Sequence, residues 1–243
     1  MFHDENRKLI YEGKAKILYT TSNHDGFIQH FKDDITAFNN QKHDIIDGKG
    51  IINNYISGFL MKSLSDIEIP THLIKILNMR EQLVQKLEMI ALEVVVRNVV
   101  SGSLLKRINM TEGKKIKEPI IEFYYKNDKL NDPLVTDEHI MSAELLQFWE
   151  IDLIKEYALK INDFLRGIFY MAKITLVDFK LEFGYLDGNI VLGDEISPDS
   201  CRLWDIETKE KMDKDRYRLS LGNVIDGYRK VANRLGLINI ENQ

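Results

Sequence analysis

The chain has 243 residues, of which 44% are hydrophobic and 29% charged, and its formal net charge at pH 7 is −5. These proportions are ordinary for a soluble globular protein of one large or two small domains, and the acidic balance excludes a broad basic surface for nucleic acid. A single cysteine excludes an internal disulfide, and no apolar run suggests a signal peptide or a membrane span, so a reducing, cytoplasmic setting is expected.

The first half of the chain is predicted to consist mainly of strands. Residues 9–13 and 14–21 predict a hairpin with Gly13 at its bend, and residues 26–31 predict a further strand. Three strands rich in β-branched residues are expected at 72–77, 81–90 and 92–100. A helix packed on this sheet is predicted between Gly50 and Leu64 from apolar residues at helical spacing, namely Ile51, Tyr55, Phe59, Met61 and Leu64.

The second half mixes strands with longer helices. Residues 101–108 predict a loop that enters a short helix, and residues 120–128 predict a strand. An apolar stripe predicts one long helix over 142–173, and residues 215–237 predict one or two helices, broken near Gly222. Strands and helices do not alternate regularly, so an α+β architecture fits better than a doubly wound sheet. We expect a boundary near residue 90, between parts 1–90 and 91–243.

The segment 176–205 is the most informative part of the chain, because it places a set of charged residues in one β-rich segment. In its first half apolar side chains alternate with Asp178, Lys180 and Glu182, which indicates a strand with one packed and one charged face. Such a face suits Mg²⁺ and phosphate, because hard cations take oxygen ligands. The alternative is the solvated face of a half-buried sheet. The acids after the Asp187-Gly188 hairpin signal favour the binding site.

Two other segments are candidates for phosphate binding. Lys14 and Lys16 follow Gly13 on one face of a strand, although they do not form a Walker loop and could belong to a plain basic edge strand. Arg97 lies at the end of a strand, and the small-residue loop 101–103 then opens a helix, which together could hold a phosphate. The alternative is a helix capped by a serine of this loop, with Arg97 paired to an acid.

The six histidines show no H-x-x-x-H or H-E-x-x-H spacing, which argues against a histidine metal site. Cys201 has no histidine partner in the sequence and is expected to be a packed small residue.

Taken together, these segments resemble the SAICAR synthetase family nearly from end to end. The pair VRN…GS and VDFKLEFG, in this order and at this distance, is highly specific. Ala91 stands where the family usually has Pro, and Ser101 where it usually has Ala or Thr. The matching segments are YEGKAK at the start, DDITAFNN and DGKGIINN near 33–54, LEVVVRNVVSGS at 92–103, EFYYKNDKLNDP at 122–133, LVDFKLEFG at 176–184, LGDEISPDSCRLWD at 192–205 and MDKDRYR at 212–218.

The resemblance implies a ligase that joins L-aspartate to carboxyaminoimidazole ribotide (CAIR) with ATP, giving SAICAR, ADP and phosphate. It also implies Mg²⁺, a homodimer, and a two-part α+β fold. The N-terminal part would bind the nucleotide with a sheet similar to the small lobe of protein kinases, and the C-terminal part would hold the substrate and Mg²⁺ sites.

The resemblance also assigns roles to residues. Near the nucleotide it places Lys14, Lys16 and Lys126. It makes Glu182 and Asp194 the Mg²⁺ ligands, and puts Lys180 beside the reacting carboxylate with Asp178 next to it.

The remaining roles concern the other two substrates. Arg97, Ser103 and Arg202 would hold the 5′-phosphate of the ribotide. Asp199 would contact its imidazole-ribose part, and Lys214 and Arg216 are candidates for the carboxylates of aspartate.

The hairpin register leaves one point open. A strict two-residue turn at Asp187-Gly188 pairs Lys180 with Glu195 and turns Asp194 to the apolar side. A three-residue loop with a bulge at Gly188 would turn Asp194 to the charged side, as the metal role needs.

Two other function classes use part of the same chemistry. A phosphotransferase acting on a hydroxyl would share the Mg²⁺ and lysines, although the loop motifs of protein kinases are missing. A non-catalytic nucleotide-binding module would have lost part of the charged set, all of which this chain keeps.

Overall fold

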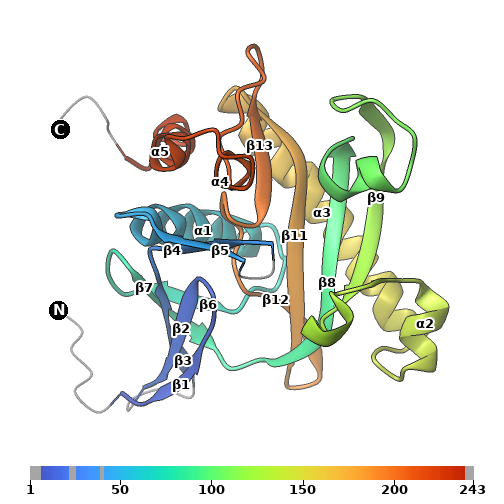
Figure 1. Cartoon of the computed structure of the whole chain (residues 1–243). Helices are drawn as coiled ribbons and strands as arrows, with labels where there is room; N and C mark the ends of the chain where they lie inside the picture. The colour runs from blue at the N-terminus through green and yellow to red at the C-terminus, as the bar shows by residue number, and fades with distance from the viewer. Residues whose placement is uncertain (1–6, 22–25, 39–40, 239–243) are drawn as a thin grey trace.

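The structure, a computed structural model, describes residues 7–21, 26–38 and 41–238. Within these residues the named strands form two larger antiparallel sheets and a two-stranded hairpin, and helices pack against the sheets (Figure 1). The expected α+β class is confirmed. No helix in this part of the chain is both long and apolar enough to cross a membrane.

The first sheet has five strands in the order β1-β2-β3-β7-β6. The predicted hairpin is confirmed, since β1 pairs with β2 and the Gly13 N–H donates to the Lys16 carbonyl at 2.8 Å. The strands are β1 (Leu9–Glu12), β2 (Lys16–Thr20), β3 (Gly26–Phe31), β6 (Leu73–Ile76) and β7 (Glu81–Gln85).

Helix α1 (Lys49–Ser65) packs on the first sheet, as predicted, and Met61 and Leu64 of the expected apolar stripe are fully buried. The rest of the stripe, Ile51, Tyr55 and Phe59, was wrong, because these side chains are only partly buried. The helix instead buries the row one residue further on, Ile52, Ile56 and Leu60, together with several polar side chains. A small hairpin of β4 (Asp34–Ala37) and β5 (Lys42–Ile45) precedes α1.

The second sheet has the order β10-β9-β8-β11-β12, and β13 also pairs with β11 (Figure 1). Residues 81–90, predicted as one strand, divide at 86–87, so that β7 ends in the first sheet and β8 begins in the second. The division into domains at residue 90 stays a prediction. The strands are β8 (Glu88–Val99), β9 (Lys115–Tyr125), β10 (Leu134–Val135), β11 (Ile174–Leu186), β12 (Asn189–Gly193) and β13 (Cys201–Asp205).

The predicted helix over 142–173 is confirmed as one helix that starts later than expected, and a short helix that was not predicted precedes it. Helix α2 (Asp137–Ser142) has Thr136 as its N-cap, and α3 (Phe148–Met171) starts at a capping box in which the Gln147 N–H donates to Glu150 at 2.6 Å. The C-terminal pair is confirmed as α4 (Asp215–Arg218) and α5 (Val224–Arg234). Short 3₁₀ helices cover Gly102–Lys106 and Asp128–Leu130.

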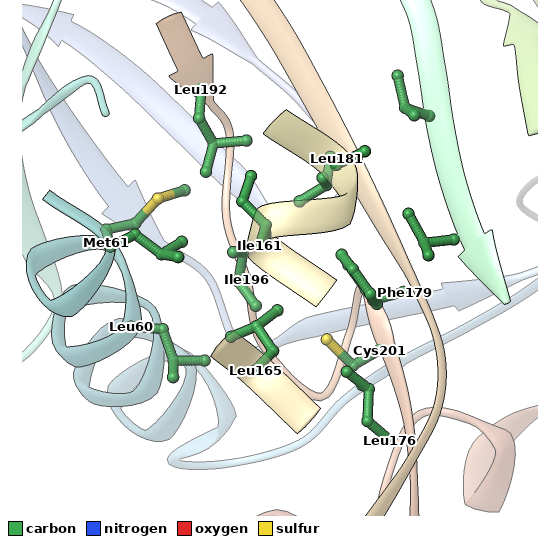
Figure 2. Close-up of a cluster of buried hydrophobic side chains, with 14 of the residues drawn as sticks. Leu60, Met61, Ile161, Leu165, Leu176, Phe179, Leu181, Leu192, Ile196 and Cys201 are labelled. Atoms are coloured by element: carbon green, nitrogen blue, oxygen red, sulfur yellow. The ribbon is translucent and has the colours of Figure 1, made fainter. Parts of the chain in front are cut away.

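The main core lies between the second sheet and the helices α1, α3 and α5. Cys201 is buried in it, as expected of a packed residue, and burial raises the pKa of its thiol. Figure 2 shows part of this core, with Leu60, Met61, Ile161, Leu165, Leu176, Phe179, Leu181, Leu192, Ile196 and Cys201 labelled.

Candidate active site

Two central strands of the second sheet carry charged side chains on one face. The register places Glu93 of β8 opposite Glu182 of β11, and Arg97 of β8 opposite Asp178. Lys180 lies between the two acids of β11, and alternate residues of a strand share a face. The charged face predicted from the alternation in 176–183 is therefore formed.

A β-bulge in β11 determines which residues point to this face. The register against β13 shifts between Leu176 and Asp178, so Val177 is an extra residue. Leu176 belongs to the main core, and strict alternation would have placed Asp178 beside it. Val177 itself packs in a small separate cluster, so its expected place in the main apolar face was wrong.

Glu182 lies at the centre of a cluster of opposite charges. It accepts a hydrogen bond from Lys180 at 2.5 Å, and its other oxygen accepts one from Lys126, directly after β9. Lys180 also donates to Glu93 at 3.0 Å and lies 3.9 Å from Asp194. The structure thus brings the two expected metal ligands and two expected lysines together.

Lys16 reaches the same cluster from the first sheet. It donates to Asp194 and lies 3.0 Å from a carboxylate oxygen of Glu195. Burial alone would lower the pKa of Lys16, but the charges of Asp194 and Glu195 outweigh burial and raise it. Burial also opposes the charged forms of Lys180 and Asp194, yet opposite charges raise the pKa of Lys180 and lower that of Asp194. These three groups are therefore charged near neutral pH.

The turn before Asp194 resolves the open point of register. Asp187 and Gly188 form a strict two-residue turn, and both have the positive φ of a type I′ hairpin, so the bulge at Gly188 is not formed. β12 ends at Gly193, and Asp194 then takes a left-handed φ of 58°. This local turn directs the Asp194 carboxylate to Lys16 without a change of register in the hairpin.

A cavity of about 670 Å³ lies between the two sheets. The charge cluster lines it together with Lys14 and Lys126, and its apolar lining comes from Leu18, Phe27, Val84, Leu87 and Met89. Its volume is in the range of small-molecule sites. An apolar wall beside a group of lysines and carboxylates suits a nucleotide with its base and phosphates.

A second cavity of about 360 Å³ lies over β8, β11 and β13. Arg97, Ser103, Asp178 and Arg202 line it, and the two cavities share Glu93, Lys180, Asp199, Ser200 and Lys214. Lys180 therefore stands where the two cavities meet.

Arg97 is buried beneath the second cavity. Its guanidinium donates to Glu122 at 2.7 Å, to Asp178 at 2.9 Å, to Ser103 at 2.9 Å and to Tyr124 at 3.1 Å. The pairing with acids weighed for Arg97 is confirmed, whereas the serine cap is not, since no side chain caps the helix that starts at Gly102.

Arg202 lies against the loop that Arg97 supports. Its guanidinium donates to Asp178 and Asp215, at 2.9 and 2.8 Å. Gly102 has a φ of 59°, and a Cβ there would lie 2.6 Å from the Arg202 guanidinium. Only glycine allows both this backbone conformation and this contact. The floor of the cavity is thus a chain of alternating charges with one positive charge in excess, made of Arg218, Asp215, Arg202, Asp178, Arg97, Glu122 and Arg107.

Helix α4 and the residue before it bring two cations to the site, and one differs from expectation. Lys214 lines both cavities, and its ammonium has no hydrogen bond or ion pair among the described residues; burial lowers its pKa. Arg216 points elsewhere, donating to the Gly222 carbonyl and to Glu210, both at 2.9 Å. Arg218 lines the second cavity in its place.

The sequence also carried signals for residues that we missed. Arg218 lies four residues after Lys214, which is one helical turn, and Glu93 shares a strand face with Arg97. Lys49, which donates to Asp199 at 2.6 Å, had no comparable local signal because its contact crosses 150 residues of chain.

The acids of the site fit one kind of metal. Among the described residues no three His, Cys, Asp or Glu side chains are grouped so that they could hold an ion. Glu182 and Asp194 offer two carboxylates, and Mg²⁺ is usually held by one or two carboxylates with substrate phosphates and water. The donor set therefore fits Mg²⁺ that binds together with a nucleotide, and does not fit a structural metal.

Comparison with known proteins places this geometry in a family. The model of the SAICAR synthetase family matches residues 9–235. A phosphoribosylaminoimidazole-succinocarboxamide synthase from Neorickettsia sennetsu is 57% identical over 96% of this chain and 98% of its own length.

Two solved structures are similar over nearly the whole chain. The crystal structure of the corresponding synthase from Ehrlichia chaffeensis has a TM-score of 0.93 and 56% identity, covering 96% of this chain and 100% of that one. A SAICAR synthetase in complex with ADP has a TM-score of 0.91 and 45% identity, covering 94% and 97% of the two chains. The chain therefore belongs to the SAICAR synthetase family, the ligases that form this succinocarboxamide in purine biosynthesis.

Proposed function

We propose that the protein joins L-aspartate to the carboxylate of carboxyaminoimidazole ribotide, with ATP converted to ADP and phosphate. The observation that carries this proposal is the junction of two cavities at Lys180. A ligase of this kind must bring a nucleotide and a carboxylate substrate together at one charged point, away from most of the solvent.

The cavity between the sheets suits ATP. Lys14, Lys16 and Lys126 supply positive charge along it, and a relative with 45% identity binds ADP. Glu182 and Asp194 would hold Mg²⁺, which neutralises charge on the phosphates. With a nucleotide bound, Lys16 and Lys126 would exchange their carboxylate partners, Asp194 and Glu182, for phosphate oxygens.

The second cavity suits the ribotide. Arg202 and Ser103 face it at the loop after β8, where they would hold the 5′-phosphate. Arg97 supports this loop from below and fixes Asp178, which leaves Arg202 as the more accessible guanidinium. Asp199, at the junction of the cavities, would contact the imidazole-ribose part.

The chemistry proceeds in two displacements. A carboxylate oxygen of the ribotide attacks the γ-phosphorus of ATP, and ADP leaves, which forms an acyl phosphate. The amine of aspartate then attacks the acyl carbon, phosphate leaves and the amine loses a proton. Lys180 is placed to stabilise the negative charge that moves between the carboxylate and the phosphoryl group.

Aspartate must bring two carboxylates to the same junction. The Lys214 ammonium there has no hydrogen bond or ion pair with any residue that the structure describes, and Arg218 lines the second cavity. We assign these two cations to aspartate in place of the expected pair of Lys214 and Arg216.

Measurement of ADP release tests the proposal. The purified protein should release ADP only when ATP, Mg²⁺, the ribotide and aspartate are all present. Equal ADP release without aspartate would indicate a phosphotransferase, and binding of ATP without any turnover would indicate a nucleotide-binding module.

The expected assembly is a homodimer in the cytoplasm. Sedimentation of the purified protein distinguishes a dimer from a monomer directly, and imaging of a tagged chain tests the compartment.

A further inference from the structure

Asp199 is held by three buried donors that belong to two helices. Its Oδ2 accepts hydrogen bonds from Lys49 at 2.6 Å and Asn53 at 2.8 Å, and its Oδ1 accepts one from the hydroxyl of Tyr228 at 2.7 Å. The side chains of Lys49 and Asp199 are only 1% and 6% exposed, and Tyr228 is fully buried. Three donors therefore fix both oxygens of one carboxylate.

The donors come from parts of the chain far from Asp199 in sequence. Lys49 and Asn53 lie four residues apart on one face of α1, at its N-terminal end, and Tyr228 comes from the middle of α5. The two helices pack against each other, and Figure 1 shows α5 next to α1 on the same side of β11. The loop 194–200 thus receives its support from both helices at once.

A purely structural role does not explain this arrangement well. A buried ion pair costs desolvation energy, and apolar side chains could join α1 and α5 at lower cost. Asp199 lines both cavities, and within the described part of the chain its Oδ1 accepts one hydrogen bond, although a carboxylate oxygen can accept two. One acceptor position on Asp199 is therefore available to a ligand donor.

We propose that Tyr228, Lys49 and Asn53 are positioning residues that orient the Asp199 carboxylate toward the ribotide. The inference rests on the proposed function, and it adds the C-terminal helix α5 to the elements that determine affinity for this substrate. Because these hydrogen bonds reach both oxygens, they fix the rotation of the carboxylate plane about the Cβ–Cγ bond. Ribotide donors then bind a carboxylate that needs no reorganisation.

The test uses Tyr228→Phe in the full chain, which removes one hydroxyl and keeps the ring. The KM for the ribotide should rise about three- to tenfold, the size expected for one lost hydrogen bond, while the KM for ATP stays within twofold. Tyr185→Phe is the matched control, because its hydroxyl also donates to a carboxylate, that of Glu150 at 2.8 Å, outside both cavities. Its KM values should match those of the unmodified protein.

A double-mutant cycle with Asp199→Asn distinguishes an effect of Tyr228 on the orientation of Asp199 from a general loss of stability. If Tyr228 acts through Asp199, the second substitution should raise the KM for the ribotide by less than twofold in the Asp199→Asn background. Asn53→Ser removes another hydrogen bond to the same carboxylate, and it replaces Tyr228→Phe in this test if that variant does not fold.

Three outcomes would overturn the inference: no change in KM for the ribotide, equal changes for ribotide and ATP, or full additivity with Asp199→Asn. Failure of the proposed function would look different, because the unmodified protein itself would then show no turnover of the ribotide with aspartate.

Discussion

Glu182 illustrates how a single carboxylate can be buried without belonging to the core. It is 6% exposed, yet its neighbours are Lys180 and Lys126 rather than apolar side chains. A carboxylate in this position balances the positive charge of both lysines.

Glu182→Gln should therefore abolish most turnover while the fold persists. Glutamine keeps the shape, but it offers Mg²⁺ a neutral and weaker ligand, and it leaves two lysines without their shared acid. Turnover should fall by about a hundredfold or more, the range found when one group that stabilises the transition state is removed. Rates measured against Mg²⁺ concentration check this, and near-normal turnover at ordinary Mg²⁺ would remove Glu182 from the metal site.

Arg97 is expected to affect stability and ribotide binding together. Lysine keeps the positive charge, but it cannot donate hydrogen bonds to Glu122, Asp178 and Ser103 at once, because it lacks the planar guanidinium of arginine. Arg97→Lys should destabilise the fold by about 1.5–3 kcal/mol for each charge-assisted hydrogen bond that is lost. It should also weaken ribotide binding, with little effect on ATP.

Arg107→Lys is the matched control for Arg97→Lys, because Arg107 binds the same Glu122 from a more exposed position. Thermal unfolding and a titration with each substrate measure both variants. Equal losses of stability in the two, or a loss confined to ATP binding, would contradict this account of Arg97.

Among the elements, the loop after β8 combines a left-handed backbone at Gly102 with a close contact to Arg202. Gly102→Ala adds a Cβ at a left-handed φ and within 2.6 Å of the Arg202 guanidinium, so Arg202 must move. We expect a destabilisation of about 1–2 kcal/mol from the backbone and at least a tenfold weaker binding of the ribotide from the displaced guanidinium.

Gly188→Ala separates these two effects. Gly188 has a φ of 79°, but nothing lies within 4 Å of the added Cβ. This variant should lose a similar amount of stability and keep ribotide binding. Unchanged ribotide affinity in Gly102→Ala would show that Arg202 does not hold the ribotide.

The strands show what the sequence reveals about elements and what it does not. The alternation in 176–183 correctly placed Lys180 and Glu182 on a charged face, because a repeat of two residues depends only on the local sequence. The bulge at Val177 was not visible, because it depends on how β11 pairs with β13. The break at 86–87 was missed for the same reason: both flanking segments are good strands, and only tertiary contacts assign them to different sheets.

Helix faces were harder to predict than helix positions. α1 has apolar residues on more than one side, so two stripes compete, and the row of Ile52, Ile56 and Leu60 is the one that enters the main core. In α4 the sequence DRYR offers two arginines, and only the orientation of a single helical turn brings Arg218 rather than Arg216 to the cavity.

At the scale of the whole molecule, the buried acid Asp213 predicts a dependence of stability on pH. Burial, with the nearby charge of Asp215, raises the pKa of Asp213 to about 7. An unfolded aspartate has a pKa of about 3.9, so the folded state favours the protonated form. The stability that this group contributes is therefore highest in acid, falls as pH rises between these two values, and is constant above pH 7.

The free energy of unfolding should fall by an amount on the order of 4 kcal/mol over that interval from this group alone. Chemical denaturation between pH 5 and 8 measures the slope, which Asp213→Asn should remove. Asp226→Asn is a suitable control, because Asp226 lies on the exposed side of α5. An equal slope in Asp213→Asn and the unmodified protein would mean that another group titrates.

The central claim is that the γ-phosphoryl group of ATP passes to the ribotide carboxylate. This claim concerns the whole molecule, because the transfer needs both cavities and Lys180 between them. Transfer of an oxygen isotope tests it most directly. With ¹⁸O in the ribotide carboxylate, complete turnover with ATP and aspartate should yield phosphate that carries one ¹⁸O atom, because the acyl C–O bond breaks in the second step. Phosphate without ¹⁸O, formed together with the succinocarboxamide product, would contradict the account.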